Sequence, residues 1–224
     1  MAMKTYINLP YVKRRQIPEE FRDDDNRTPE SLIEYFIHQF TKSGDTVFDP
    51  FAGLGTTLFV AEEMGRIPFG IEIDERRCEY VRSQLAMKDN IILGDSRYLD
   101  KFQLPPLDFV FTSPIFMRSN ETKNPLSGYR EQGTYQNYLD ELQSIFRKVR
   151  ELLKPEAKVI IEVFNLRATS TRPMTLLAWD IARAISGVLR FEKEIIACWQ
   201  SENRGDSSYI YGYNHSYCLV FDSK

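Results

Sequence analysis

The sequence predicts an α/β protein with a doubly wound, mostly parallel sheet, and two observations lead to this prediction. Short apolar runs alternate with amphipathic segments of roughly ten to twenty residues along most of the chain. Glycine or acidic residues directly follow several of the apolar runs, as at 53–55, 72–74 and 94–95. Doubly wound sheets bind ligands at these ends of their strands. The pattern therefore indicates an α/β domain with a ligand site along one edge of its sheet.

The first helix is expected to begin near residue 28. Thr28 can cap it, Pro29 fits its first turn, and apolar residues recur at helical spacing as far as Phe40. A turn that contains glycine follows, and then a strand at 46–50. Further strands are expected at 68–74, 90–93, 107–112, 158–164, 191–199 and 217–222, and further helices at 56–64, 75–87, 135–153 and 173–186.

The end of the chain and its polar stretches complete the predicted organisation. No long helix separates the last two strands, so an antiparallel strand is expected near the C-terminus of a seven-stranded sheet. Residues 1–27 are polar and mixed in charge, and are expected to form an N-terminal segment before a single domain at 28–224. The long polar stretch at 117–134 is expected to be a mobile loop.

The composition limits the classes of function. The net charge of −3 shows no basic excess of the kind usual in stand-alone nucleic-acid-binding proteins. Any contact with a nucleic acid must therefore be local or shared with a partner. The 3 cysteines are scattered and there are only 2 histidines, so no metal site is expected. No apolar run of membrane-spanning length and no signal peptide is seen, so a cytoplasmic protein is expected.

Glycines and carboxylates after neighbouring strands predict a nucleoside site. Gly53 and Gly55 can adopt positive φ and lack the Cβ atom that would obstruct a ligand. Neither a third glycine nor a lysine follows, so the dinucleotide fingerprint and the P-loop are not matched. Glu72 is placed to accept hydrogen bonds from ribose hydroxyls and Asp95 from an adenine amino group, while carboxylates at Asp49 and Glu72 suit a sulfonium cation. The alternative is a tight turn at the glycines and a solvated carboxylate at Glu72.

Five stretches resemble the S-adenosylmethionine-dependent amino-methyltransferases of the adenine-N6/cytosine-N4 DNA type. One is the expected helix at 31–40, which resembles the segment that packs beside the methionine end of the cofactor. Residues 49–57 are similar to that family's cofactor motif and residues 65–74 to its ribose-binding strand. Ser113-Pro114-Ile115-Phe116 looks like its catalytic tetrad, and residues 215–221 look like its last strand. The resemblance implies a Rossmann-like methyltransferase sheet and S-adenosyl-L-methionine as cofactor. The cofactor-binding residues expected from the chemistry and the resemblance together are Asp49, Phe51, Gly53, Gly55, Thr56, Glu72, Asp95 and Ser96.

The tetrad has the groups that methylation of a base amine requires. The exocyclic amine of adenine or cytosine is a poor nucleophile because its lone pair is delocalised into the ring. The Ser113 hydroxyl and the Pro114 carbonyl could accept its two N–H bonds and aim its lone pair at the methyl group, while Phe116 stacks on the ring. A base in a duplex would first have to be flipped out. Ser113, Pro114 and Phe116 are therefore the expected catalytic residues. The alternative is an ordinary proline turn with Phe116 in the core.

The chain departs from the family pattern in two respects. Ile115 stands where the family has a second proline, so packing must stiffen the loop. Sequence-specific DNA members also carry a separate target-recognition region, for which only residues 1–27 and 117–134 remain here. The side chains expected to contact the substrate are Ile115, Arg118, Tyr129 and Arg130, although a lid over the cofactor is an equally good interpretation of 117–134.

The sequence thus predicts an S-adenosylmethionine-dependent N-methyltransferase that acts on an exocyclic amino group of a nucleic-acid base. DNA is favoured over RNA as the substrate, and a homo-oligomer or a partner subunit could supply target recognition. Two alternatives remain open: methylation of a protein side-chain amide, and a cofactor-binding subunit that has lost activity. A nicotinamide oxidoreductase fits the sequence least.

Overall fold

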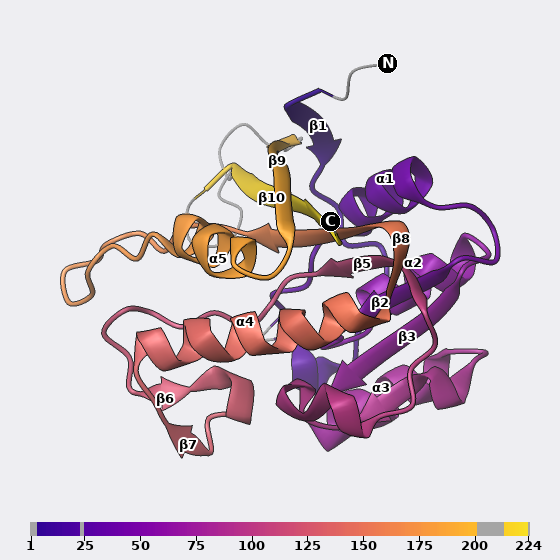
Figure 1. Ribbon diagram of the computed structural model, residues 1–224, viewed down its shortest axis with the longest axis horizontal. Coiled ribbons are helices and arrows are strands. Elements are labelled where there is room, and N and C mark those ends of the chain that lie inside the picture. Colours follow the sequence, from indigo (N-terminus) through magenta and orange to yellow (C-terminus); the bar gives the residue numbers. More distant parts are fainter. Residues whose placement is uncertain (1–3, 23–24, 201–212, 224) are drawn as a thin grey trace.

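The fold is a central sheet with helices packed on both of its faces (Figure 1). The computed structural model describes residues 4–22, 25–200 and 213–223. The strands of the central sheet are β1 (Tyr6–Pro10), β2 (Thr46–Asp49), β3 (Ile67–Glu72), β4 (Ile91–Leu93), β5 (Leu107–Thr112), β8 (Leu153–Val163), β9 (Arg190–Gln200) and β10 (His215–Asp222). The helices are α1 (Glu30–Phe40), α2 (Thr56–Glu63), α3 (Glu75–Gln84), α4 (Tyr135–Leu152) and α5 (Leu177–Ser186), with short 3-10 helices η1 (Glu19–Phe21), η2 (Lys88–Asn90), η3 (Ser96–Lys101) and η4 (Pro125–Ser127).

The strand order of the sheet is β1-β9-β10-β8-β5-β2-β3-β4. Neighbouring strands are parallel except that β10 runs antiparallel to both β8 and β9. From β2 the chain moves outward to β3 and β4, and then crosses back to β5 on the other side of β2. The predicted doubly wound, mostly parallel sheet with an antiparallel strand near the C-terminus is confirmed. The order reverses between β2 and β5, which is the place where such sheets bind ligands.

The sheet has one strand more than predicted, so the count of seven was wrong. The additional strand is β1, which pairs in parallel with β9 at the edge of the sheet. Only Ile7 of β1 is buried, so the apolar signal that identifies a strand in the sequence is almost missing there. Part of the polar N-terminal segment therefore belongs to the sheet.

Consecutive residues of β10 show which helices cover which face. The ring of Tyr217 lies 5.1 Å from the ring of Trp179 in α5. Cys218 is paired with Glu162 of β8, whose carboxylate accepts a hydrogen bond from Thr28, just before α1. Because consecutive strand residues point to opposite faces, α5 and α1 cover opposite faces of the sheet. Helix α4 packs beside α5, and α2 beside α1.

The longest helix, α4, forms because one of its faces is apolar and its start is well capped. Tyr138, Leu142 and Val149 recur at helical spacing and are fully buried. At the N-terminus, Thr134 and Asn137 form a reciprocal capping box. Both features can be read in the sequence, and the predicted helix at 135–153 is confirmed to within one residue.

Two other helix starts differ from the prediction. Helix α1 begins after Pro29 and no side chain caps it. The Thr28 hydroxyl donates to Glu162 instead, in a contact between distant parts of the chain. Helix α5 begins at Leu177 rather than at residue 173, because Thr175 forms a β-bridge with Leu166. In both places a tertiary contact decides the local structure.

Residues 117–134 form a folded connection between β5 and α4. The small hairpin of β6 (Lys123–Asn124) and β7 (Glu131–Gln132) lies within it. The Asn124 side chain accepts a hydrogen bond from the backbone N–H of Leu126 at the start of η4. Gly128 and Tyr129 then turn the chain with φ of 64° and 62°. The mobility of this connection stays a prediction.

Two absences hold for the described residues. No helix among them combines the length and the apolar character that crossing a membrane requires. Within the same ranges, no three His, Cys, Asp or Glu side chains are grouped so that they could hold a metal ion.

Candidate active site

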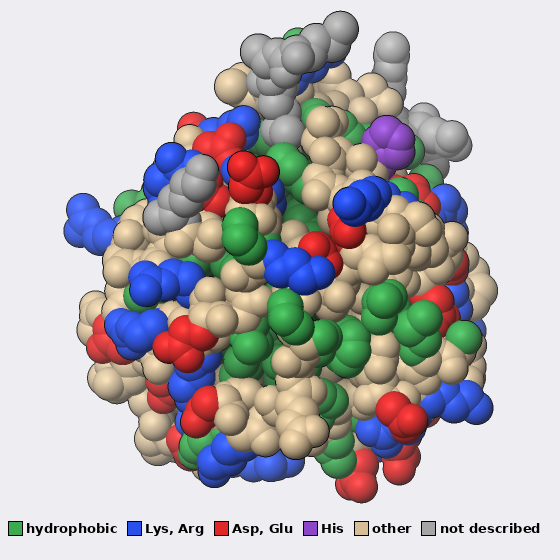
Figure 2. Space-filling model, turned by 45° about the vertical axis from the view of Figure 1, so that its right-hand side comes forward, with side chains coloured by type: hydrophobic (Ala, Val, Ile, Leu, Met, Phe, Trp, Pro, Cys, Tyr) green, Lys and Arg blue, Asp and Glu red, His purple; other side chains and the backbone are tan. Residues whose placement is uncertain are grey.

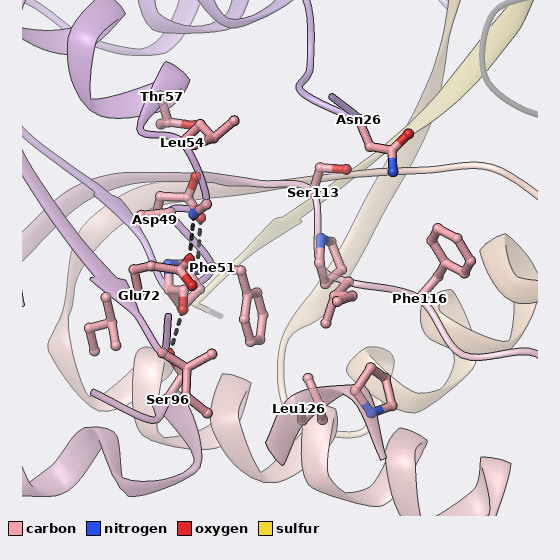
Figure 3. A pocket seen from close by; sticks show the side chains of 18 of the residues that line it. Asn26, Asp49, Phe51, Leu54, Thr57, Glu72, Ser96, Ser113, Phe116 and Leu126 are labelled. Atoms are coloured by element: carbon pink, nitrogen blue, oxygen red, sulfur yellow. Dashed lines mark hydrogen bonds between the residues drawn. The ribbon is translucent and has the colours of Figure 1, made fainter. Parts of the chain in front are cut away.

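A cavity of about 540 Å³ lies at the carboxyl edge of the sheet, over the switch point between β2 and β5 (Figure 3). Its walls come from the segments that follow β2, β3, β4, β5 and β8, and from residues 26–28. Gly55, Arg118 and Arg130 do not line it. The predicted site residues that the cavity brings together are Asp49, Phe51, Gly53, Thr56, Glu72, Asp95, Ser96, Ser113, Pro114, Ile115, Phe116 and Tyr129.

The two glycines after β2 have different structural roles. Gly53 has φ of 54°, and a Cβ added there would meet only the Phe51 carbonyl, 3.9 Å away. Gly55 has φ of 80°, and a Cβ there would lie 2.8 Å from both γ-carbons of Val81 in α3. Gly53 therefore leaves space at the cavity, as predicted for both glycines. Gly55 instead permits the close packing of α2 against α3.

Glu72 ends β3 with its carboxylate held by the backbone. Its Oε2 accepts a hydrogen bond from the N–H of Gly53 at 2.7 Å, and its Oε1 accepts from the N–H of Asp74 at 2.8 Å. Burial raises the pKa of this carboxyl above its ordinary value, and the two N–H groups oppose that shift. A carboxylate has about four acceptor positions. Two therefore remain for hydroxyl groups of a ligand.

Asp49 is a buried carboxyl group at the end of β2. Its Oδ1 accepts a hydrogen bond from the N–H of Phe51 at 2.9 Å (Figure 3). It also accepts one from the Thr112 hydroxyl at 2.7 Å. Burial raises its pKa to about 6, although Thr112, Phe51 and Thr57 all hydrogen-bond to the charged form. Thr112 is the last residue of β5, so this contact joins the two strands at the switch point. Thr112 could not be identified from the sequence, because its contact with Asp49 depends on which strands are neighbours in the sheet.

Asp95 and Ser96 line the cavity but are held by protein groups. The Asp95 carboxylate caps η3 and pairs with the Arg97 guanidinium, with Nη2 and Oδ2 2.8 Å apart. The Ser96 hydroxyl donates to the carbonyl of Pro50 (Figure 3). This hydrogen bond connects the segment after β4 to the loop after β2.

The tetrad lies directly after β5, at the other end of the cavity from Glu72 (Figure 3). The ring of Phe116 meets the ring of Phe164 edge to face at a centroid distance of 6.1 Å. The carbonyl of Ile115 accepts a hydrogen bond from the buried Tyr138 hydroxyl at 3.0 Å. This contact with α4 holds the loop at Ile115.

The substrate-contact residues predicted in 117–134 are separated by the fold. Tyr129 lines the cavity and is half exposed. Arg118 is only 3% exposed, and its Nη1 donates to the carbonyl of Arg167 at 3.1 Å. Arg130 is exposed and lies outside the cavity wall. Of these three, Tyr129 is the one placed to meet a ligand in the cavity.

Polar residues that the sequence analysis missed complete the tetrad end of the cavity. Asn26, Thr28 and Glu162 line it together with Ser113. Glu162 is 1% exposed, and the pairing of Thr112 with Ile161 places it on the strand beside Ser113. The signal for Glu162 was a charged residue inside the apolar run of β8. For Asn26 no signal exists in the sequence, because only the fold brings it to Ser113.

The amino-acid sequence matches DNA methyltransferases over its N-terminal third. Residues 9–83 match a family described as DNA methylase. The type II methyltransferase M2.DpnII of Streptococcus pneumoniae is 42% identical over 61 residues, which are 27% of this chain and 23% of that protein. The DNA adenine methyltransferase YhdJ of Escherichia coli is 37% identical over 79 residues, which are 35% of this chain and 26% of that protein. The matching segment thus spans about a quarter of the length of these relatives.

Solved structures extend the likeness to nearly the whole chain. TrmN from Thermus thermophilus superposes with a TM-score of 0.58 at 16% identity, over 93% of this chain and 54% of TrmN. A TehB-like SAM-dependent methyltransferase from Corynebacterium glutamicum superposes with a TM-score of 0.55 at 14% identity, over 92% of this chain and 93% of the other. At such identities the likeness concerns the fold alone. The chain therefore has the Rossmann-like fold of S-adenosylmethionine-dependent methyltransferases, and over residues 9–83 it resembles the N6-adenine/N4-cytosine DNA methylases.

Proposed function

We propose that this protein is an S-adenosylmethionine-dependent methyltransferase that methylates an exocyclic amino group of a nucleic-acid base, adenine N6 or cytosine N4. One observation supports the proposal most. A single cavity is lined at one end by the carboxyl groups of Asp49 and Glu72, and at the other by Ser113 and Pro114. The first end offers acceptors to a cationic nucleoside, and the second offers acceptors to an amine. Methyl transfer requires both ligands in one site with their reacting atoms in contact.

The carboxylate end fits S-adenosylmethionine. Two N–H groups fix the Glu72 carboxylate and leave acceptor positions for the two ribose hydroxyls. The absent side chain of Gly53 leaves space beside it. When bound, S-adenosylmethionine supplies an electrophilic methyl group on a positively charged sulfur. The ionised form of Asp49 stabilises that charge, and Asp95 remains the proposed partner of the adenine amino group.

The tetrad end suits a flat amine. Ser113 Oγ and the Pro114 carbonyl accept the two amine hydrogens, which directs the nitrogen lone pair towards the cofactor end. Phe116, whose ring meets Phe164, stacks on the base. These residues act by position, because a methyl transfer between two aligned ligands needs no strong base from the protein. A base from a duplex reaches this end only after it has been flipped out.

DNA is the proposed polynucleotide. The Escherichia coli relative is named a DNA adenine methyltransferase, and the family that matches residues 9–83 is described as DNA methylase. On the face shown in Figure 2, apolar side chains gather near the middle, and basic and acidic side chains are mixed around them. With a net charge of −3, binding depends on local contacts or on a second subunit. We propose the cytoplasm as the location and a homo-oligomer or a partner subunit as the source of target recognition.

The decisive experiment follows a tritiated methyl group from S-adenosylmethionine into separate DNA, RNA and protein fractions. Label in N6-methyladenine or N4-methylcytosine of DNA is the expected result, and the Ser113→Ala variant should lose most of it. Label confined to protein would overturn the nucleic-acid proposal and favour amide methylation. Calorimetry of S-adenosylmethionine binding is run on the same preparation. If the cofactor does not bind, the proposal of a methyltransferase fails altogether.

A further inference from the structure

Asn26 lines the tetrad end of the cavity from outside the tetrad. It belongs to the segment that leads into α1, far from β5 in the sequence. In Figure 3 its side-chain amide lies beside Ser113, and the hydroxyl of Ser113 points towards it. Asn26 is exposed at the mouth of the cavity that it lines. An amide in this position faces the same ligand as the Ser113 hydroxyl.

The backbone on both sides of Asn26 is held in place. The Arg27 guanidinium donates to the Asp25 carboxylate at 2.8 Å and to the carbonyl of Arg15 at 3.2 Å. The N–H of Arg27 donates to Asp25 Oδ1, and the Thr28 hydroxyl donates to Glu162. Contacts of both neighbours therefore fix the position of Asn26.

The side chain of Asn26 is, by contrast, uncommitted. Across residues 4–22, 25–200 and 213–223, no hydrogen bond to its amide is found, although an amide can donate two and accept two. An exposed amide in a cavity wall is hydrated in the free protein, and an acceptor on a ligand can take the place of that water. The amide is thus available to a ligand, as the Ser113 hydroxyl is.

The neighbouring groups show which bond is missing. Ser113 is engaged as an acceptor for the target amine in the proposed reaction, and the Thr28 hydroxyl already donates to Glu162. Glu162, when ionised, can only accept. Among these described polar side chains, the Asn26 amide is the donor without a partner. The ligand that completes this end of the cavity must therefore present an acceptor next to its amine.

Adenine and cytosine have that acceptor. In both bases an unprotonated ring nitrogen, N1 of adenine or N3 of cytosine, is adjacent to the carbon that bears the amine. In guanine the carbon that bears the amine lies between N1, which carries a hydrogen, and N3, which does not, so this contact alone does not exclude guanine. A glutamine side chain has no ring nitrogen. We infer that Asn26 is a specificity-determining residue that donates from Nδ2 to the ring nitrogen beside the target amine. This inference rests on the proposed function and adds the contact by which the enzyme would distinguish a base from a side-chain amide.

The test removes each partner of this hydrogen bond in turn. Oligonucleotides carry either the base that the wild-type protein methylates or its deaza analogue, in which C–H replaces the ring nitrogen (1-deazaadenine or 3-deazacytosine). With the natural base, Asn26→Ala should lower kcat/KM by about 5- to 150-fold, the usual range for one specific base contact. With the deaza analogue, the kcat/KM of the wild type should fall by a similar factor. The kcat/KM of Asn26→Ala with the analogue should be little lower than that of either single change.

A second variant and a binding measurement separate recognition from folding. Asn26→Asp has the same size but cannot donate when ionised, so it should behave like the alanine variant or worse. The affinity of each protein for the oligonucleotides, measured by fluorescence anisotropy with S-adenosylhomocysteine present, should follow the same pattern. Cofactor affinity, measured by calorimetry, should not change.

Two results would overturn the inference. The first is that the losses of kcat/KM caused by the variant and by the analogue multiply when the two are combined. The second is weakened cofactor binding in Asn26→Ala. If the wild type transfers no methyl group to any base, the proposed function fails, and this outcome is distinct from the other two.

Discussion

The two ends of the cavity are built in different ways. At the cofactor end, Glu72 and Gly53 contact each other through a hydrogen bond of 2.7 Å and lie 19 residues apart in the sequence. At the target end, Asn26, Ser113 and Glu162 come from three segments that only the sheet brings together. One end is thus a local motif, and the other is a meeting point of distant segments.

This difference explains what the known relatives share with the chain. The match to DNA methylases covers residues 9–83, which include Gly53 and Glu72 of the cofactor end and Asn26 of the target end, and which end before Ser113 and Glu162. A local motif keeps its sequence spacing wherever the same ligand is bound. An end assembled from distant segments can change its chemistry one segment at a time, and it is the end that determines the substrate.

The largest expected effect is at the cofactor end. Glu72→Ala removes the acceptor for the ribose hydroxyls and leaves the N–H groups of Gly53 and Asp74 without their partner. The affinity for S-adenosylmethionine should fall by about 100-fold or more, since hydrogen bonds to a charged group are worth about 1.5–3 kcal/mol each. Calorimetry measures this directly. Ser113→Ala, at the other end, is the matched control: it should bind the cofactor like the wild type while methyl transfer is lost. Equal losses of cofactor affinity in both variants would refute the division into two ends.

Alanine substitutions at the two glycines of the loop after β2 should have different effects, one mainly on the stability of the fold and the other on cofactor binding. In Gly55→Ala the new methyl group would lie 2.8 Å from Val81 at a φ of 80°, so the free energy of unfolding should fall by about 2–4 kcal/mol. In Gly53→Ala the same strain arises without the clash, so the loss of stability should be about 1–2 kcal/mol. Its methyl group borders the cavity, so cofactor affinity should fall.

Urea denaturation and calorimetry on the two alanine variants test this contrast. If Gly53→Ala were the less stable variant and bound the cofactor normally, the assignment of the two glycines would be reversed.

Features formed within short stretches of chain could be predicted from the sequence, and features that depend on contacts between distant segments could not. The sheet, α4 and the carboxylates of Asp49 and Glu72 could be predicted because periodicity and motifs act over short stretches of chain. Strand β1 was missed because an edge strand with one buried residue has almost no pattern. Thr28 was taken for a helix cap, since its contact with Glu162 spans 134 residues. Gly55 was expected to contact the ligand. Its actual neighbour, Val81, is brought close by the packing of α2 against α3, which the sequence does not show.

A smaller effect is expected from the ionisation of Asp49. Burial raises its pKa to about 6, so the carboxyl group is mostly ionised at pH 7.5 and mostly neutral at pH 5. The anion favours the sulfonium, and the affinity for S-adenosylmethionine should therefore fall as the pH drops below about 6, by up to tenfold per unit. S-adenosylhomocysteine lacks the positive sulfur and should show a weaker dependence. The comparison is made by calorimetry at several pH values.

Asp49→Asn separates this carboxyl group from Glu72, whose pKa is also raised. In this variant the difference between the two ligands should no longer depend on pH. The folded state of the wild type holds the Asp49 proton to a higher pH than the unfolded chain does, so the contribution of this group to stability declines as the pH rises from about 4 to 6. A ligand difference that stayed pH-dependent in Asp49→Asn would contradict the assignment.

The smallest expected effect tests how the target end is held without a second proline. Tyr138→Phe deletes only the hydroxyl that donates to the carbonyl of Ile115 at 3.0 Å, and should reduce stability by about 0.5–1.5 kcal/mol. Because this bond helps fix the tetrad, methyl transfer should fall several-fold while cofactor affinity stays the same. Tyr135→Phe is the matched control, since its hydroxyl donates to Asp180 at 2.9 Å, outside the tetrad. If both variants lost stability and neither lost transfer, the contact at Ile115 would serve folding alone, and the loop would owe its shape to the packing of Phe116 against Phe164.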